Sequence, residues 1–407
     1  MLHAFSGRPD GAFPYAGLLA GQHGEFFGTT VAGGVIGPSG YDAGVVYEIS
    51  ASGKEKVLYS FQGGNDGLSA QGTLIADSSG NLYGVTTYGG GSSNCSAGCG
   101  TVFQLRPSGS GYTERVLYAF QGGQDGELPV SALLLGSNGV LYGTTIAGGS
   151  GSGCWPPSSN TGCGTVYSLT PSGSTYTEKV LHSFTSGADG EYPTAKLTTD
   201  NKGNLYGTTL FGGISNTACQ ADPVGVKTCG TVFEVNAKDK ERILYRFAGG
   251  ASDGANTRAA LLPGKNGSFY GVTHRGGGAG VGTAFQLTRN GKSYSEKLLY
   301  SFGSGGTGDG LVPNDTDGLI TDKNGNLYGT TQLGGQTSCS CGTVFELSPA
   351  GSGYSETVLY SFGGLPDAEA PYSSVVLVGK HLYGTGNGGT LCEGSSFQCG
   401  AVYKVNL

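Results

Sequence analysis

The sequence predicts an all-β fold, a seven-bladed β-propeller whose blades are four-stranded antiparallel sheets. One observation is the phrase Asn-Leu-Tyr-Gly-Thr-Thr at 204–209, which occurs in seven similar copies, each followed by a run similar to the Gly-Thr-Val-Phe at 230–233. The other is a phrase like Val-Leu-Tyr-Ser-Phe at 57–61, which marks repeats that start near 2, 58, 117, 181, 244, 299 and 359. Short β-branched and aromatic runs at such a regular period are typical of propeller blades.

Each repeat is expected to supply four strands in a fixed order. The Val-Leu-Tyr-Ser-Phe phrase forms the outer strand of one blade, and a glycine-rich turn with an aspartate leads to the short apolar inner strand of the next. A tight turn such as Asp-Asn-Lys-Gly-Asn at 200–204 then leads to the second strand, because Asp, Asn and Gly adopt the backbone conformations that hairpins need. The second strand is Leu-Tyr-Gly-Thr-Thr, and a longer loop connects it to the third strand, Gly-Thr-Val-Phe.

The two ends of the chain predict that the blades close into a ring. The chain begins on a lone outer strand, Leu2 to Phe5, and ends on a third strand, Gly400 to Tyr403, with no outer strand after it. An N-terminal strand that closes the last blade removes the exposed edges that a sheet must otherwise protect. An open β-solenoid is the alternative, but it gives no reason why the strand that is missing from the last repeat should be present at the start of the chain. We therefore expect a single propeller domain over residues 1–407.

Charge and hydropathy exclude several classes of partner. The formal net charge is −7, so the chain offers no basic surface for nucleic acid. No stretch of 18 apolar residues is present, so we expect no membrane insertion. Glycine accounts for 80 of the 407 residues, but without a Gly-X-Y period, which excludes collagen. We expect a monomer.

The ten cysteines fall into five local pairs, each in the loop between the second and third strands of one repeat. Zinc sites would need ligands from separated Cys-x-x-Cys motifs, whereas one disulfide per loop fits the spacing. Disulfides indicate an oxidising compartment, so we expect an extracellular or cell-surface protein. The chain opens without a signal peptide, so we expect a mature or trimmed form. The expected pairs are Cys95–Cys99, Cys154–Cys163, Cys219–Cys229, Cys392–Cys399 and, with a strained one-residue spacer, Cys339–Cys341.

The repeat resembles a known family, the GloVer (Gloeobacter/Verrucomicrobia) tandem repeat of bacterial surface and secreted proteins. The shared motifs are Leu-Tyr-Gly-Thr-Thr-x-x-Gly-Gly, then Gly-Thr-Val-Phe, then Val-Leu-Tyr-Ser-Phe with Gly-Gly-x-Asp-Gly, and they cover essentially the whole chain. The resemblance implies an extracellular bacterial protein. It implies no particular chemistry.

Antiparallel strand order places the aspartate turns and the cysteine loops on one face, which we call the loop face. Function in repeat scaffolds is expected on the face with the longest and most variable loops. The fifth repeat departs most from the pattern, because it has His274 and Arg275 after the second strand, Arg258 before the inner strand, and no cysteine. Arginine neutralises a sugar carboxylate and histidine transfers a proton, so these three residues are catalytic candidates for a polysaccharide lyase. Variable, solvated loop residues are the alternative.

Carboxylates and aromatic rings on the loop face supply further candidates. Asp315 and Asp317 are candidate acids for glycoside hydrolysis, which uses a pair of carboxyl groups. Aromatic rings stack on sugars, although packing beneath the long loops is the alternative role. Tyr15 and Tyr372 hold matching positions in the first and seventh repeats, which ring closure makes neighbours. The candidate substrate-binding residues are Tyr15, Tyr88, Trp155, Tyr192, Lys196, Phe211 and Tyr372.

An aspartate recurs in the turn before every inner strand. Seven aspartates could form a ring of cation sites, but a residue present in every repeat is better explained as the cap of its own turn. No loop supplies the six to eight oxygens of a Ca²⁺ site in a recognisable order, so we expect no metal and no cofactor. These aspartates are Asp10, Asp66, Asp125, Asp189, Asp253, Asp309 and Asp367.

The sequence therefore predicts a protein that binds extracellular polysaccharide on its loop face. In the enzymatic version it also cleaves the polysaccharide by lyase or glycosidase chemistry. The alternative is a non-catalytic surface or matrix protein that mediates adhesion or assembly through the same loops. A deep polar pocket that joins His274, Arg258 and a carboxylate or tyrosine would favour an enzyme, and a flat ring of aromatic side chains would favour binding alone.

Overall fold

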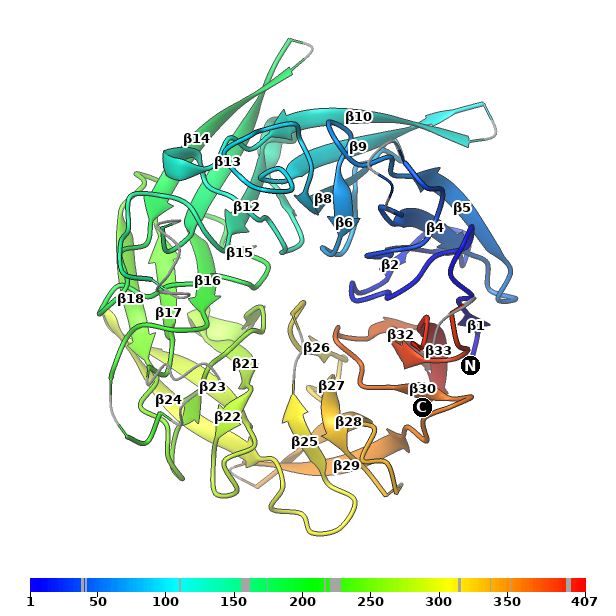
Figure 1. Cartoon of the computed structure of the whole chain (residues 1–407). Coiled ribbons are helices and arrows are strands. Elements are labelled where there is room, and N and C mark those ends of the chain that lie inside the picture. Colours follow the sequence, from blue (N-terminus) through cyan, green and yellow to red (C-terminus); the bar gives the residue numbers. More distant parts are fainter. Residues whose placement is uncertain are drawn as a thin grey trace.

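The computed structural model is a ring of seven antiparallel sheets around a central axis (Figure 1). It describes residues 1–37, 40, 42–109, 111–154, 162–173, 175–215, 217–219, 228–313, 316–336, 338–351, 353–392 and 397–407. Short inner strands face the axis, and the longest strands form the rim. The predicted seven-bladed propeller is confirmed.

Every blade runs from an inner strand, through a second and a third, to an outer strand. Blades 1 to 3 consist of β2 (Leu19–Ala20), β3 (Phe26–Thr29), β4 (Val45–Ile49) and β5 (Glu55–Ser60); β6 (Leu68–Ala70), β7 (Ile75–Ala76), β8 (Leu82–Tyr88), β9 (Thr101–Ser108) and β10 (Gly111–Ala119); and β11 (Leu134–Leu135), β12 (Leu141–Thr145), β13 (Thr165–Ser172) and β14 (Thr175–Ser183). Blades 4 and 5 consist of β15 (Thr198–Thr199), β16 (Leu205–Thr209), β17 (Thr231–Val235) and β18 (Glu241–Arg246); and β19 (Gly254–Ala255), β20 (Leu262–Pro263), β21 (Phe269–Thr273), β22 (Arg275–Gly276), β23 (Thr283–Asn290) and β24 (Ser293–Ser301).

Blades 6 and 7 follow the same order, and in both the inner strand is split into two short segments. They consist of β25 (Gly310–Pro313), β26 (Ile320–Thr321), β27 (Leu327–Gly334), β28 (Thr343–Ala350) and β29 (Gly353–Ser361); and β30 (Ala368–Glu369), β31 (Val376–Val378), β32 (His381–Gly388), β33 (Ala401–Asn406) and β1 (His3–Ala4). Three single 3-10 turns complete the regular structure: η1 (Gly123–Asp125), η2 (Ser137–Gly139) and η3 (Lys265–Gly267).

The N-terminal strand closes the ring. β1 pairs antiparallel with β33, the third strand of blade 7, with His3 opposite Val402 and Ala4 opposite Ala401. The Phe5 N–H continues the ladder by donating to the Gly400 carbonyl at 2.9 Å. β1 is therefore the outer strand of blade 7, which confirms the predicted closure.

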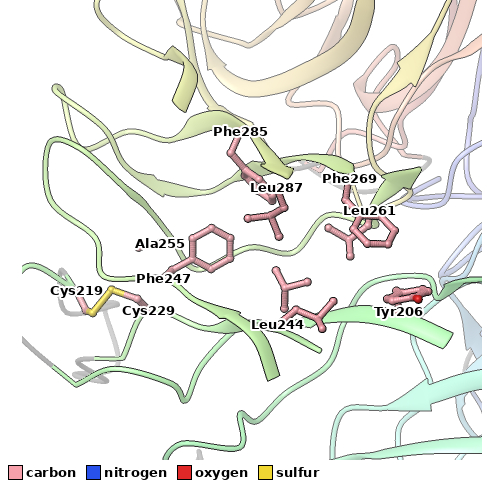
Figure 2. Close-up of a cluster of buried hydrophobic side chains, with 11 residues drawn as sticks. Tyr206, Cys219, Cys229, Leu244, Phe247, Ala255, Leu261, Phe269, Phe285 and Leu287 are labelled. Atoms are coloured by element: carbon pink, nitrogen blue, oxygen red, sulfur yellow. A yellow bond between two sulfur atoms is a disulfide. The ribbon is translucent and has the colours of Figure 1, made fainter. Parts of the chain in front are cut away.

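One aromatic contact repeats at every junction between blades. The phenylalanine after each outer strand is fully buried and packs edge-on against the third-strand ring of the next blade, with centroids 4.8 to 5.2 Å apart. Figure 2 shows one such pair, Phe247 and Phe285. The glycine of Tyr-Gly-Thr-Thr makes room for the third-strand ring, because a Cβ on Gly207 would lie 2.5 Å from Phe233 Cζ. Burying each phenylalanine stabilises the junction by about 1.5–3 kcal/mol.

The two threonines of the same phrase have different partners. In blade 4, the Thr209 hydroxyl lies 2.8 Å from that of Thr231 in the third strand, and blades 2, 3, 5 and 6 have the same buried pair. Thr208 instead donates to the Ala259 carbonyl of blade 5 at 3.0 Å, as its counterparts do in blades 3, 6 and 7. One hydroxyl therefore closes its own blade, and the other joins it to the next, so that both buried groups are satisfied.

Five disulfides cross the loops between second and third strands and join the expected cysteine pairs. Figure 2 shows the Cys219–Cys229 bond beside the core. The aspartate turns lie against these loops, since a Cβ on Gly122 would be 3.0 Å from Cys99 Sγ and one on Gly249 would be 2.9 Å from Cys229 Sγ. The turns and the disulfide loops therefore share the loop face, as predicted.

Candidate functional site

One residue of every blade lines a single cavity of about 230 Å³ where the inner strands begin, at the loop-face end of the axis. In each repeat this residue stands four positions before the start of the short inner segment, which is β2, β7, β11, β15, β20, β26 or β31. Ile146 and Tyr192 complete the wall. We call this space the mouth cavity. Its seven equivalent residues are Tyr15, Gln71, Val130, Thr194, Arg258, Thr316 and Tyr372.

Three tyrosines form the aromatic part of the mouth cavity. The rings of Tyr15 and Tyr372 lie 4.8 Å apart, so ring closure brings these two residues together. Burial, and then the Coulombic interaction with Tyr372, raises the pKa of Tyr15 above that of a free phenol, which is itself neutral at pH 7. Tyr192 precedes the inner strand of blade 4. Its backbone N–H donates to the Cys163 carbonyl at 2.9 Å, which anchors it. The disulfide of Cys163 thus helps to position a wall residue.

Arg258 is the one charged residue among the described residues that line the mouth cavity. It forms no ion pair with any described residue, and its Nε is buried without a hydrogen-bond partner among them. Thr194 Oγ1, on the neighbouring wall, is buried in the same unpartnered state. Buried polar atoms are almost always hydrogen-bonded in folded proteins, so both atoms are available to bind a polar ligand in the mouth cavity.

His274 lies close to Arg258 but is not among the residues that line the mouth cavity. Its backbone N–H donates to the Asn256 carbonyl at 3.2 Å, and its imidazole Nδ1 is buried without a partner among the described residues. Burial, reinforced by the charges of Arg258 and Arg275, lowers the pKa of His274 to about 3. The imidazole is therefore neutral at pH 7, and it is a weak base.

The other sequence candidates are scattered. Phe211 is fully buried and leaves no ring face open to a sugar, whereas Tyr88 is exposed at the end of β8, away from the mouth cavity. Arg275 pairs with Ala255 between β22 and β19 and does not line the mouth cavity. Lys196 and Asp317 line a second cavity, further along the inner strands. Trp155 and Asp315 lie outside the described residues.

Each turn aspartate is used within its own turn. Asp253, for example, accepts the Ala248 N–H at 2.7 Å and the Tyr245 hydroxyl at 3.1 Å, both from the end of the preceding outer strand. The other six accept the same two bonds, with histidine in place of tyrosine at Asp10 and Asp189. The aspartates are therefore caps, as their recurrence predicts. His182, Asp189 and Glu241 bring three potential ligand atoms together, which is fewer than Ca²⁺ requires.

Comparison with known protein families shows to which of them the chain is related. The Gloeobacter/Verrucomicrobia repeat matches residues 1–219 and 219–407. The chain belongs to this family. No curated protein matches its sequence.

Solved structures with a similar shape to this family member share little sequence with it. A candidate 6-phosphogluconolactonase from Bacteroides uniformis aligns with a TM-score of 0.50 at 11% identity, over 95% of each chain. An ulvan lyase, described as representing a new polysaccharide lyase family, aligns at 0.48 and 10%, over 100% of this chain and 95% of its own. A protein of unknown function from Dyadobacter fermentans aligns at 0.46 and 11%, over 99% and 97%. At these identities the likeness describes the fold alone.

Sequence reasoning missed five wall residues of the mouth cavity. The family repeat itself contains the signal that would have found four of them. When the seven copies are aligned on the leucine or valine just before the inner segment, the residue three places earlier varies freely between Tyr, Gln, Val, Thr and Arg, while the residue after it is Ala, Gly or Ser in six of the seven copies. A variable position in an otherwise uniform repeat indicates a surface that faces a ligand or solvent. The missed residues are Gln71, Val130, Ile146, Thr194 and Thr316.

Proposed function

We propose that the protein binds an acidic extracellular polysaccharide in the mouth cavity. The observation that carries this proposal is the convergence of seven equivalent positions on one cavity, whose described lining has a single charged side chain, Arg258, and three tyrosines. A guanidinium forms paired hydrogen bonds with a carboxylate or sulfate group. Tyrosine rings offer an apolar face to the C–H side of a sugar and a hydroxyl to its rim.

Electrostatics support an anionic sugar at this position. The protein is acidic as a whole, with a net charge of −7, yet the described wall of the mouth cavity holds a positive charge and no carboxylate. An anion bound there would meet the unpaired Nε of Arg258 in a partly buried setting, where the attraction is screened less than at an open surface.

We propose binding rather than cleavage. Lyase chemistry needs a base near the operating pH and within hydrogen-bond reach of the proton that it removes. His274 has a pKa of about 3 and does not line the mouth cavity. Asp317, the described one of the two candidate acids, lines the second cavity instead.

The setting that we propose is extracellular. Five disulfides are compatible with an oxidising compartment. Within the described residues, no helix is long and apolar enough to cross a membrane. Soluble polysaccharides outside the cell are ligands that such a protein would meet.

A panel of acidic and neutral polysaccharides, tested by calorimetry and by assays for new reducing ends and unsaturated uronate, tests the proposal. We expect binding of acidic chains without cleavage, and a loss of affinity of about 10- to 100-fold in Arg258→Ala, as is typical for a charged hydrogen bond. Arg275→Ala is the matched control, because this arginine belongs to the same blade but not to the cavity wall. Equal affinity of wild type and Arg258→Ala for every chain would refute the proposed site.

A further inference from the structure

A hydrogen-bonded link crosses the axis of the ring just beyond the mouth cavity. The Thr73 hydroxyl of blade 2 donates to Asp317 Oδ2 of blade 6 at 2.6 Å, and it accepts the Gly17 N–H of blade 1 at 2.7 Å. Blades 2 and 6 are three places apart, which is the largest separation that a ring of seven allows. The contact is close, because a Cβ on Gly17 would lie 2.5 Å from Asp317 Oδ2.

This link lies between two cavities along the axis. Because every blade has the same antiparallel strand order, all the inner strands run from the loop face toward the opposite face of the ring. Thr316 lines the mouth cavity, whereas the next residue, Asp317, lines a second cavity of about 580 Å³. Thr194 and Lys196 divide between the two cavities in the same way. The Asp317–Thr73 bond therefore lies where the mouth cavity ends.

The mouth cavity is small. At about 230 Å³ it is smaller than the roughly 300–1,000 Å³ of pockets that enclose drug-sized ligands. Such a space suits one sugar residue rather than several. A residue in the middle of a chain has a neighbour on each side. Because the Asp317–Thr73 link obstructs the inner end of the mouth cavity, the loop face is the way out that remains for a connected sugar.

We propose that the mouth cavity takes a single terminal acidic sugar, at the non-reducing end of a chain or the tip of a branch, and does not take internal residues of a threaded chain. This inference rests on the proposed function and specifies the part of the glycan that the same site recognises. Arg258 binds the carboxylate of the terminal sugar, and Tyr15 and Tyr372 flank its ring. The remainder of the chain leaves across the loop face.

Linear polygalacturonate fragments of increasing length, titrated into the full protein by calorimetry, separate the two modes of binding. We expect one protein per chain at every length, because each chain carries one non-reducing end. Reduction of the terminal carboxyl group to an alcohol should weaken binding by at least tenfold. Arg258→Ala should show the same loss with the untreated fragments.

The outcomes distinguish this inference from the proposed function. A number of bound proteins that rises with chain length, or equal affinity for fragments with a reduced terminal group, overturns end recognition and leaves acidic-glycan binding intact, provided that Arg258→Ala still loses affinity. Absence of binding to every acidic chain on the wider panel overturns both. In Asp317→Ala, which removes the link, longer fragments are expected to bind more than one protein; Asp317→Asn keeps the size of the side chain and serves as the control.

Discussion

The stability of the propeller is expected to depend on the protonation of glutamates that face the turn aspartates, and Glu296→Gln tests this. Glu296 lies on β24, the outer strand of blade 5, near Asp253 in the turn that leads into the same blade. Burial, together with the charge of Asp253, raises the pKa of Glu296 from 4.5 to about 7. Its Oε1 is buried without a partner among the described residues. Burial and the charge of a turn aspartate raise the pKa of four further glutamates to about 7: Glu55, Glu114, Glu178 and Glu241. The pKa of Glu356 rises to about 8, because a hydrogen bond with Asp309 adds to the same two causes.

The sign of the effect follows from proton linkage. Because the folded pKa is the higher one, the folded state binds more protons than the unfolded chain between about pH 4.5 and 7, and stability falls as the pH rises through this range. A pKa difference of this size corresponds to a change of at most about 3 kcal/mol in the free energy of unfolding. The side chain is only partly buried, so solvent screening reduces the expected loss to about 1 kcal/mol for Glu296 between pH 4.5 and 8.

Glu296→Gln removes this loss, because the amide is neutral at every pH and keeps the shape of the side chain. We expect the variant to be more stable than wild type by about 1 kcal/mol at pH 8, and equal to it at pH 4.5. Urea unfolding of the oxidised protein at both values measures the difference. Glu346→Gln on β28, where the carboxylate accepts a hydrogen bond from Ser348, is the control. It should change the free energy of unfolding by the same amount at both pH values. Equal pH dependence of Glu296→Gln and wild type would refute the reasoning.

Three further predictions concern closure, the mouth cavity and the disulfides. Deletion of residues 1–5 removes β1 and the buried Phe5, so we expect a loss of about 3–5 kcal/mol or more by thermal unfolding, and an unchanged melting temperature would contradict ring closure by this strand. Tyr372→Ala should weaken binding of an acidic oligosaccharide by about two- to tenfold, as expected for one aromatic contact, whereas Tyr88→Ala should leave it unchanged. Replacement of both Cys219 and Cys229 by serine should cost about 2–3 kcal/mol, and no change in urea midpoint would show that the loop is already ordered without the bond.

The fold was predictable because each contact that builds it is written into the repeat. The buried pair of Thr209 and Thr231, and the packing of Phe247 on Phe285, need only local strand order and a neighbouring copy of the same repeat. Ring closure followed from the missing outer strand of the last repeat, which β1 supplies. A sequence that repeats the same contacts leaves few competing arrangements.

The site was predictable only in part. The meeting of Tyr15 and Tyr372 followed from closure, since it makes blades 1 and 7 neighbours. The bond between Asp317 and Thr73 could not be foreseen, because it crosses the axis between blades that share no strand pairing and are 244 residues apart. The sequence also left open whether Phe211 stacks on a sugar or packs beneath its loop, because a loop aromatic and a core aromatic have the same appearance in sequence; the structure shows it buried.

The position of a bound acidic sugar is the measurement that tests the central claim most directly. A crystal structure of the protein with a short oligogalacturonate should place the terminal carboxylate within hydrogen-bond distance of Arg258 in the mouth cavity, with its ring beside Tyr15 and Tyr372. A sugar bound on the outer surface of the disulfide loops, with the mouth cavity unchanged, would contradict the claim.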